Sequence, residues 1–252
     1  MNEFSESNEQ RKFDLKVVVM RHSVKEGMEG ALSPYGMQKA DDHFSALVRN
    51  SKSEDEDWRQ WRVASSPKER AVQTAQIQQA VREYMIGEEP DEIETVDALN
   101  EGAVEDFARP LLKEKKDWLK MWHNGEGNLP PGLLPMKDVA KNFARWLLEE
   151  IKSAKRAGGA EGIRAFSHGP LMFAVLSTIE DETGQSIITD IRAGDDRFNR
   201  EEILDMETGV LRTLQSLEFE ITSQDPANVR LSIMGKSLLV PVTIFEKIAL
   251  GE

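Results

Sequence analysis

The sequence contains no cysteine. This absence excludes disulfide bonds, metal sites built from thiolates and enzymes that use a cysteine nucleophile. It also means that packing alone must hold the fold together. With 252 residues, of which 39% are hydrophobic, the chain is long enough to bury a full-sized core. We predict a single domain spanning residues 1–252.

Positive charge is scarce relative to negative charge. The chain has 32 Lys and Arg residues against 45 Asp and Glu residues, so its formal net charge is −13. Such a field repels nucleic acid and acidic membrane surfaces, and neither is expected as a partner. An anionic ligand must therefore be attracted by a local cluster of cationic side chains.

Long hydrophobic runs are missing near the N-terminus. Residues 1–12 are polar, and no apolar run of the length of a signal peptide or a membrane span follows them. We therefore expect no membrane association and a cytoplasmic location. The sequence also shows no internal repeat and no low-complexity run.

Strand and helix patterns alternate along most of the chain. The run Lys16–Met20, rich in β-branched residues, predicts a strand buried on both faces. Ser33-Pro34 and Ser65-Ser66-Pro67 each place a helix cap before a proline suited to the first helical turn. The predicted elements are strands at 16–20, 58–64, 92–98 and 162–166, and helices at about 34–47, 68–85, 136–157 and from 169 onward. This alternation predicts an α/β fold with functional loops at strand ends.

Two stretches depart from this alternation. The segment Asn124–Pro135 is rich in Gly and Pro, which predicts a loop of lid-like length at the rim of the functional site. From Gly209 onward, apolar and polar residues alternate on both sides of a turn at Asp225-Pro226, which predicts a terminal hairpin packed on the main sheet. We assign the core to about residues 13–200 and the C-terminal hairpin and tail to about residues 209–252.

Residues suited to phosphate chemistry follow the predicted strands. They are Arg21 and His22 after the first strand, Arg70 in the second strand-to-helix turn, Glu101 after the third strand and His168 after the last. A phosphate ester must be neutralised before a nucleophile can approach it, and the planar fork of arginine matches phosphate oxygens. Two arginines and a histidine can provide this pocket without a metal ion. We therefore expect no metal site and no cofactor.

His22 is the candidate nucleophile, because a neutral imidazole has a free lone pair and can form a phosphoenzyme. The leaving alkoxide then needs a proton, which a carboxylic acid can supply. The resulting carboxylate can deprotonate the water that attacks the phosphoenzyme. Glu101 is the candidate for this role, and the nearby Glu105 is its rival.

Five short segments occur in a characteristic order. They are Val19–Ser23, Leu32–Ala40, Ser65–Ala75, Leu99–Gly102 and Ser167–Gly169. Their order and spacing resemble the successive motifs of the histidine phosphatase superfamily over roughly residues 17–179. The resemblance implies a three-layer α/β sandwich with a mixed, mostly parallel central sheet and helices on both faces.

The same resemblance implies roles for individual residues. His22 would be the phosphorylated nucleophile and Glu101 the proton donor. The phosphate pocket would consist of Arg21, Arg70, His168, Ser23 and Gly169. Ser23 departs from the glycine that usually follows the family's nucleophile, and its hydroxyl can contact either phosphate or a neighbouring backbone group.

The resemblance indicates a phosphatase that acts on a phosphorylated small molecule or a phosphoprotein and releases inorganic phosphate. Two alternatives stay open. One is a phosphoglycerate-type mutase, although Val24–Glu29 replaces the motif that the mutase branch has after the nucleophile. The other is a catalytically silent phosphate-binding module, which the presence of every catalytic residue type disfavours.

Four other side chains have simpler interpretations. His43 is expected on the surface of the first helix, whereas His123, next to the predicted lid, could meet the substrate. Trp118 and Trp122 lie four residues apart and are predicted to pack against the core, with the lining of a substrate groove as the less favoured alternative. The run Lys113–Lys116 is predicted to be a solvated charged stretch.

Overall fold

This computed structural model describes residues 13–25, 30–50, 61–87, 89–90, 92–185, 187, 213–233 and 236–251. The beginning of the predicted second strand, part of Val24–Glu29 and the end of the predicted core lie outside these residues. The described strands form one seven-stranded sheet in the order β3-β2-β4-β1-β5-β6-β7. Their bounds are β1 Phe13–Arg21, β2 Trp61–Ser65, β3 Ile93–Thr95, β4 Gly159–Ser167, β5 Ser216–Thr222, β6 Asp225–Ile233 and β7 Lys236–Pro241.

The sheet is mixed, as the family resemblance implies. The four strands β3, β2, β4 and β1 are mutually parallel, whereas β5, β6 and β7 add on in antiparallel pairs. Five of the seven strands thus point in one direction, because β6 runs the same way as β1. The predicted C-terminal hairpin is present as β5 and β6, and β5 extends the sheet beside β1. Its turn lies at residues 223–224 and not at Asp225-Pro226 as predicted, because these two residues begin β6.

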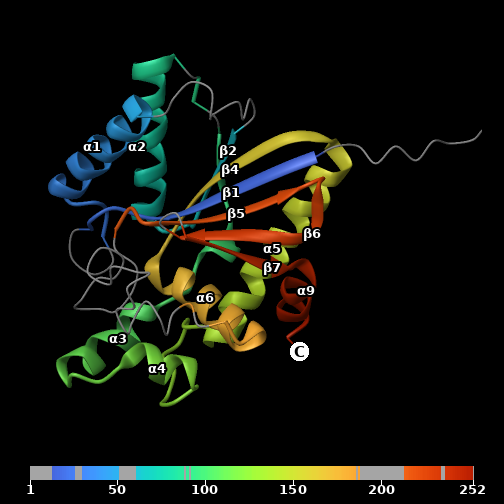
Figure 1. Cartoon of the computed structure of the whole chain (residues 1–252). Coiled ribbons are helices and arrows are strands. Elements are labelled where there is room, and N and C mark those ends of the chain that lie inside the picture. The colour runs from blue at the N-terminus through green and yellow to red at the C-terminus, as the bar shows by residue number, and fades with distance from the viewer. Residues whose placement is uncertain are drawn as a thin grey trace, which may run out of the picture.

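Helices cover both faces of the sheet (Figure 1). On one face lie α1 (Pro34–Asn50) and α2 (Glu69–Ile86), which bury Phe44 and Val81 against Met20 and Phe166. On the other face lie α5 (Met136–Ala157), α6 (Gly169–Thr183) and α9 (Val242–Leu250), which pack over Val17. The three layers are the architecture that the resemblance implies.

The helix α1 begins where its cap predicts. The Ser33 hydroxyl accepts a hydrogen bond from the Gly36 N–H at 3.0 Å, which satisfies one free donor of the first turn. Gly36 is required here, because a Cβ would lie 1.8 Å from the Val24 carbonyl oxygen. The cap therefore fixes helix α1 against the loop that follows His22.

Four sequence predictions need correction. Helix α2 begins at Glu69, and its N-cap Lys68 makes no side-chain cap. Strand β3 ends at Thr95 and is followed by a 3-10 helix, η1 (Asp97–Leu99). Strand β4 begins at Gly159 and is longer than expected. Strand β1 is fully buried on one face only, since Lys16 and Val18 on the other are half-buried.

The segment Asn124–Pro135, which was predicted to form a lid at the rim of the functional site, does not lie at that rim. Two short helices, α3 (Val104–Lys113) and α4 (Trp118–His123), precede the segment Asn124–Pro135. That segment then returns to the body of the protein, where Leu133 is buried and the Gly132 carbonyl accepts a hydrogen bond from the Ala103 N–H at 3.2 Å. It supports the backbone next to Glu101 and contributes no residue to the cavity described below.

None of the helices in the described ranges has the length and apolar character needed to cross a membrane.

Candidate active site

Sheet register brings the predicted site residues together. Arg21 at the end of β1 is paired with Ser167 at the end of β4, and Ser65 at the end of β2 is paired with Phe166. The His22 N–H donates to the Ser167 carbonyl at 2.9 Å, which places His22 beside His168. The carboxyl ends of parallel strands thus meet at one edge of the sheet, where α/β folds place their ligands.

His22 is buried, with 4% of its surface exposed, and both ring nitrogens have partners. Its Nδ1 lies 2.5 Å from the Ser23 carbonyl oxygen, so the ring hydrogen belongs on Nδ1. Its Nε2 accepts a hydrogen bond from the Arg70 Nε–H at 3.0 Å. Burial, followed by the charges of Arg21 and Arg70, lowers the pKa of His22 well below its ordinary value of 6.5. The ring is therefore neutral, with the lone pair on Nε2.

His168 lies next to this nucleophile candidate, with ring centroids 5.0 Å apart. Its Nε2 is 2.9 Å from the Ser66 hydroxyl, whereas its buried Nδ1 has no hydrogen-bond partner within the described part of the chain. Burial, followed by His22 and Arg70, lowers the pKa of His168 well below the ordinary value. His168 thus keeps one ring nitrogen available inside the site.

Glu101 is completely buried in the same place. One carboxyl oxygen, Oε1, accepts from the Lys68 ammonium at 3.0 Å, while Oε2 has no partner among the described residues. Burial raises the pKa of Glu101, although the Lys68 charge opposes this shift. The raised pKa and the unpartnered oxygen favour a protonated carboxyl that can donate from Oε2.

The residue after this acid must be glycine. Gly102 has φ of 84°, and a Cβ there would lie 2.1 Å from the Gly132 carbonyl oxygen. Close contact with the Asn124–Pro135 segment therefore fixes the position of the Glu101 backbone.

Glu105 has the opposite electrostatic setting. Its Oε1 accepts from Arg70 Nη2 at 2.6 Å and from Lys25 Nζ at 3.0 Å, and Lys68 Nζ lies 3.7 Å from Oε2. Burial alone would raise the pKa of Glu105, but Lys68, Arg70 and Lys25 together outweigh it and lower the pKa. Glu105 is therefore an internal anion held by Arg70, Lys25 and Lys68.

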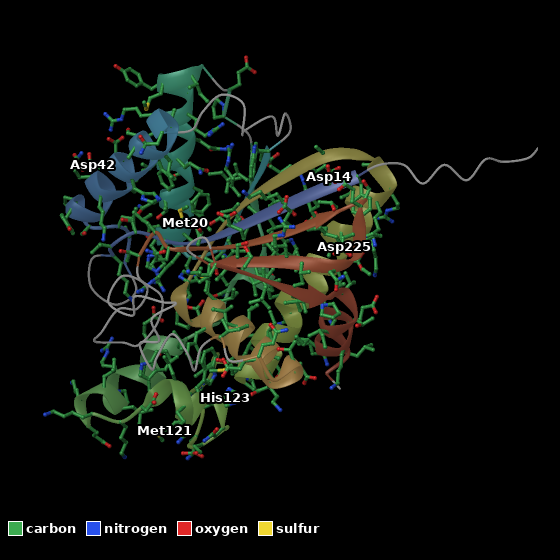
Figure 2. The ribbon with its side chains drawn as sticks, in the orientation of Figure 1. Asp14, Met20, Asp42, Met121, His123 and Asp225 are labelled. Carbon is green, nitrogen blue, oxygen red and sulfur yellow. The ribbon has the colours of Figure 1, made fainter. Side chains whose placement is uncertain are left out.

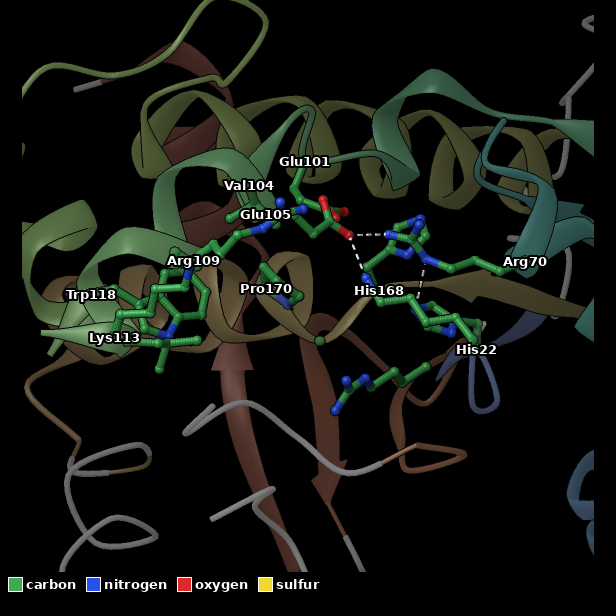
Figure 3. A pocket seen from close by; sticks show the side chains of 15 residues that line it. His22, Arg70, Glu101, Val104, Glu105, Arg109, Lys113, Trp118, His168 and Pro170 are labelled. Atoms are coloured by element: carbon green, nitrogen blue, oxygen red, sulfur yellow. Dashed lines mark hydrogen bonds and ion pairs between the residues drawn. The ribbon is translucent and has the colours of Figure 1, made fainter. Parts of the chain in front are cut away.

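A cavity of about 520 Å³ connects these groups. At one end, which we name the phosphoryl end, lie His22, Arg70 and His168; at the other, the distal end, lie Arg109, Lys113 and Trp118 (Figure 3). Arg21, which precedes His22 in the chain, also lines the cavity. Gly169 also lines the cavity, at the first residue of α6, where backbone N–H groups favour anions. The predicted site residues other than Ser23 therefore share one cavity.

Ser23 is the exception. Its hydroxyl donates to the Gly36 carbonyl at 2.7 Å, and its N–H donates to the Thr74 hydroxyl at 3.2 Å. It is fully buried and does not line the cavity. The hydroxyl was expected to contact either phosphate or a neighbouring backbone group, and it contacts the backbone of Gly36. Ser23 therefore supports helix α1 and does not face the phosphate.

Three site residues escaped the sequence analysis. Lys25 and Arg109 line the cavity, and Lys68, which does not line it, holds Glu101. The positions of Lys25, three residues after His22, and Lys68, two before Arg70, were the available signals. For the Lys113–Lys116 stretch the prediction holds only in part, since Lys113 is exposed and also lines the cavity.

The two remaining histidines are not site residues. His43 is half-buried, not on the open surface as expected, and burial lowers its pKa. His123 lies at the end of α4, with its Nε2 3.4 Å from Asp181, and does not line the cavity (Figure 2). Trp118 and Trp122 are buried and stacked, with centroids 6.3 Å apart, as predicted for a packed pair.

The three-layer architecture and the strand-end histidines define a phosphoglycerate mutase-like α/β protein. The family model of the histidine phosphatase superfamily (branch 1) matches residues 24–194. The chain belongs to this superfamily. The matched range contains Arg70, Glu101 and His168, and Arg21 and His22 directly precede it.

Solved structures support the same fold. A mycobacterial glucosyl-3-phosphoglycerate phosphatase matches with a TM-score of 0.56 and 14% identity, over 88% of this chain and 98% of that one. The protein YhfR of Bacillus stearothermophilus matches at 0.54 and 14%, over 88% and 97%. A phosphoglycerate mutase from Bacillus anthracis matches at 0.51 and 13%, over 95% and 99%. No curated protein sequence matches significantly.

Proposed function

We propose that this protein is a phosphatase that hydrolyses a phosphomonoester through a phosphohistidine on His22. The observation that carries the proposal is the state of the His22 ring. With Nδ1 bound to the Ser23 carbonyl, the lone pair of Nε2 lies beside Arg70 in the cavity. A neutral, oriented imidazole next to a permanent cation is what attack on a phosphoryl group requires.

In the first half-reaction, the substrate phosphoryl group takes the place of the Arg70 Nε–H at His22 Nε2. Arg70 and Arg21 then bind the phosphoryl oxygens, and Nε2 attacks phosphorus as the bond to the ester oxygen breaks. The raised pKa of Glu101 favours its protonated form, which gives its proton to the departing oxygen. The products are an alcohol, phosphohistidine and the Glu101 carboxylate.

In the second half-reaction, water attacks the phosphohistidine. The Glu101 carboxylate removes a proton from this water, the N–P bond breaks, and the lone pair returns to His22 Nε2. Inorganic phosphate leaves and Glu101 is again protonated. The cycle needs no cofactor, since Arg21, Arg70 and His168 supply the charge and hydrogen bonds around phosphate.

Two further observations support a phosphatase. The mycobacterial phosphatase with the same fold is also known in complexes with VO3 and with inorganic phosphate. The cavity of about 520 Å³ is large enough for a phosphorylated small molecule. The size of this cavity therefore favours a phosphorylated small molecule over a phosphoprotein as substrate.

The test is phosphate release from para-nitrophenyl phosphate and from phosphorylated metabolites by the purified chain, in the presence of excess chelator. Release of inorganic phosphate without added metal is expected. Loss of activity in chelator, with rescue by a divalent ion, would contradict the charge assignment. Transfer of the phosphoryl group to a second hydroxyl compound in preference to water would instead identify a mutase.

Binding without turnover is tested separately. Vanadate or phosphate should raise the melting temperature, because an anion that binds only the folded state stabilises it. Stabilisation with no turnover of any substrate would identify the silent binding module.

A further inference from the structure

The cavity is longer than a phosphoryl group needs. His22, Arg70 and His168 lie at one end, and Arg109, Lys113 and Trp118 lie at the other, with Pro170 and Glu105 between them (Figure 3). The distal end takes no part in the proposed phosphoryl transfer. It must therefore contact the part of the substrate that the reaction leaves unchanged.

The distal end combines an apolar wall with two cations. Val104, Ala108 and Leu112 follow one another at four-residue spacing along α3, so they lie on one face of the helix. Glu105, Arg109 and Lys113 have the same spacing one position further on, so the two cations follow Glu105 along the adjacent row. The cavity thus meets an apolar row and a charged row side by side.

The wall is rigid because the core holds it. Trp118 is 4% exposed, and its ring stacks on Trp122 at an interplanar angle of 22°. Trp122 in turn donates from its indole N–H to the Leu134 carbonyl at 2.9 Å. A buried indole fixed in this way offers a preformed surface to an aromatic or aliphatic group.

The two cations differ from those at the phosphoryl end. Arg70, Lys25 and Lys68 each contact a carboxyl group of Glu105 or Glu101. Arg109 and Lys113 are exposed, and neither makes an ion pair or hydrogen bond with another residue in the described part of the chain. Arg109 and Lys113 lie one helical turn apart, so their like charges repel each other, and a bound anion would relieve this repulsion.

We propose that the distal end is a second anion-binding subsite. The substrate is then a phosphomonoester whose apolar or aromatic body lies against Trp118 and carries a second anionic group, a carboxylate or a phosphate, bound by Arg109 and Lys113. This inference rests on the proposed phosphatase function, because it assumes that the phosphoryl group binds at His22. It makes Arg109 and Lys113 specificity-determining residues.

The test compares matched substrates. Phenyl phosphates with a para-carboxyalkyl chain of short, medium or long reach are compared with their carboxamides, which have the same leaving group and one charge fewer. The best carboxylate should exceed its carboxamide in kcat/KM by about 10- to 150-fold, the usual worth of hydrogen bonds to a charged group. Phenyl phosphates with a para-phosphonoalkyl chain of the same length are also compared, and they show whether the subsite prefers a phosphonate or a carboxylate.

The variants locate the effect. The double variant Arg109→Gln/Lys113→Gln should reduce the ratio of carboxylate to carboxamide to about one. Lys120→Gln removes a charge from an exposed residue of α4 that does not line the cavity, and it should keep the wild-type ratio. General attraction of anions cannot explain such a pattern, since it would lower the ratio in Lys120→Gln as well. Equal kcat/KM for both substrates in wild type, or the same loss of ratio in Lys120→Gln, would overturn the proposal.

A binding measurement separates the two proposals. Non-hydrolysable phosphonate analogues of the carboxylate and the carboxamide are compared by the melting temperature that each produces. If no phenyl phosphate is hydrolysed, the proposed function fails, but a larger thermal shift with the carboxylate would still support the subsite. If hydrolysis occurs and the two thermal shifts are equal in wild type, the subsite fails and the function stands.

Discussion

The two ends of the cavity are built in different ways. The phosphoryl end comes from residues that directly follow β1 and β4 and from the first turn of α2, and its side chains are buried and bonded to one another. The distal end comes from two short helices, and its cations are exposed. A backbone held by sheet register positions reacting atoms closely, whereas helices outside the sheet can vary and so select the substrate.

The strongest way to test the phosphoryl end is His22→Ala. Activity should fall by roughly 10⁴-fold or more, because no other group can accept the phosphoryl group in the same place. Quenching the wild-type protein during turnover should also trap an acid-labile, base-stable phosphoenzyme on His22. His123→Ala is the matched control, since that ring pairs with Asp181 outside the cavity, and it should keep its activity. A label on serine or aspartate would refute the mechanism.

The next effect separates the two acidic residues. Glu101→Gln should lose roughly 10²- to 10⁴-fold with an alkyl phosphate, the usual worth of positioned proton transfer. With para-nitrophenyl phosphate the phosphorylation step should suffer much less, because nitrophenolate leaves without protonation. Rates of phosphate release with both substrates provide the measurement. A leaving-group-dependent loss in Glu105→Gln, and none in Glu101→Gln, would move the acid role to Glu105.

The pH profile of kcat/KM tests the protonation states of His22 and Glu101, and its expected effect is smaller. Burial and the neighbouring arginines lower the pKa of His22, so the nucleophile should stay neutral below pH 6.5 and activity should fall only as pH drops through the lowered pKa. Burial raises the pKa of Glu101, so the acid should stay protonated above pH 4.5, and activity should fall as pH rises through the raised pKa.

On each limb of the profile, kcat/KM should change by up to about tenfold per pH unit. Glu101→Gln should remove the alkaline limb and leave the acidic one, which separates the enzyme's titration from that of the substrate. An alkaline limb that persists in Glu101→Gln would contradict the assignment of the acid.

The smallest expected effect concerns the contact between the two ends. The Glu105 carboxylate accepts a hydrogen bond from Arg70 Nη2, so an incoming phosphate must compete with this carboxylate for Arg70. Glu105→Gln should tighten vanadate binding by about fivefold, because an ion pair worth roughly 1 kcal/mol changes a binding constant by that factor. Calorimetric titration gives the constant. Weaker binding would show that Glu105 mainly positions Arg70, and Glu69→Gln, on the exposed side of α2, is the control.

Much of the fold could be predicted because it depends on local patterns. The run of β-branched residues in β1, the Ser33-Pro34 cap and the amphipathic stretch of α5 each specify an element through steric preference and periodicity. Parallel strands then bring their carboxyl ends to one edge. The proximity of His22 and His168 therefore followed from a sequence in which they are far apart.

The sequence by itself determined which residue types follow which strands, and hence the family and the candidate nucleophile. Only the tertiary structure decided that Ser23 bonds to Gly36, that Glu105 pairs with Arg70, and that Asn124–Pro135 packs behind Gly102 while α3 and α4 form the distal end. The reason is physical. Periodicity shows which face of a helix is apolar, but the packing of that helix on the core decides which side chains reach a cavity and which charges meet there.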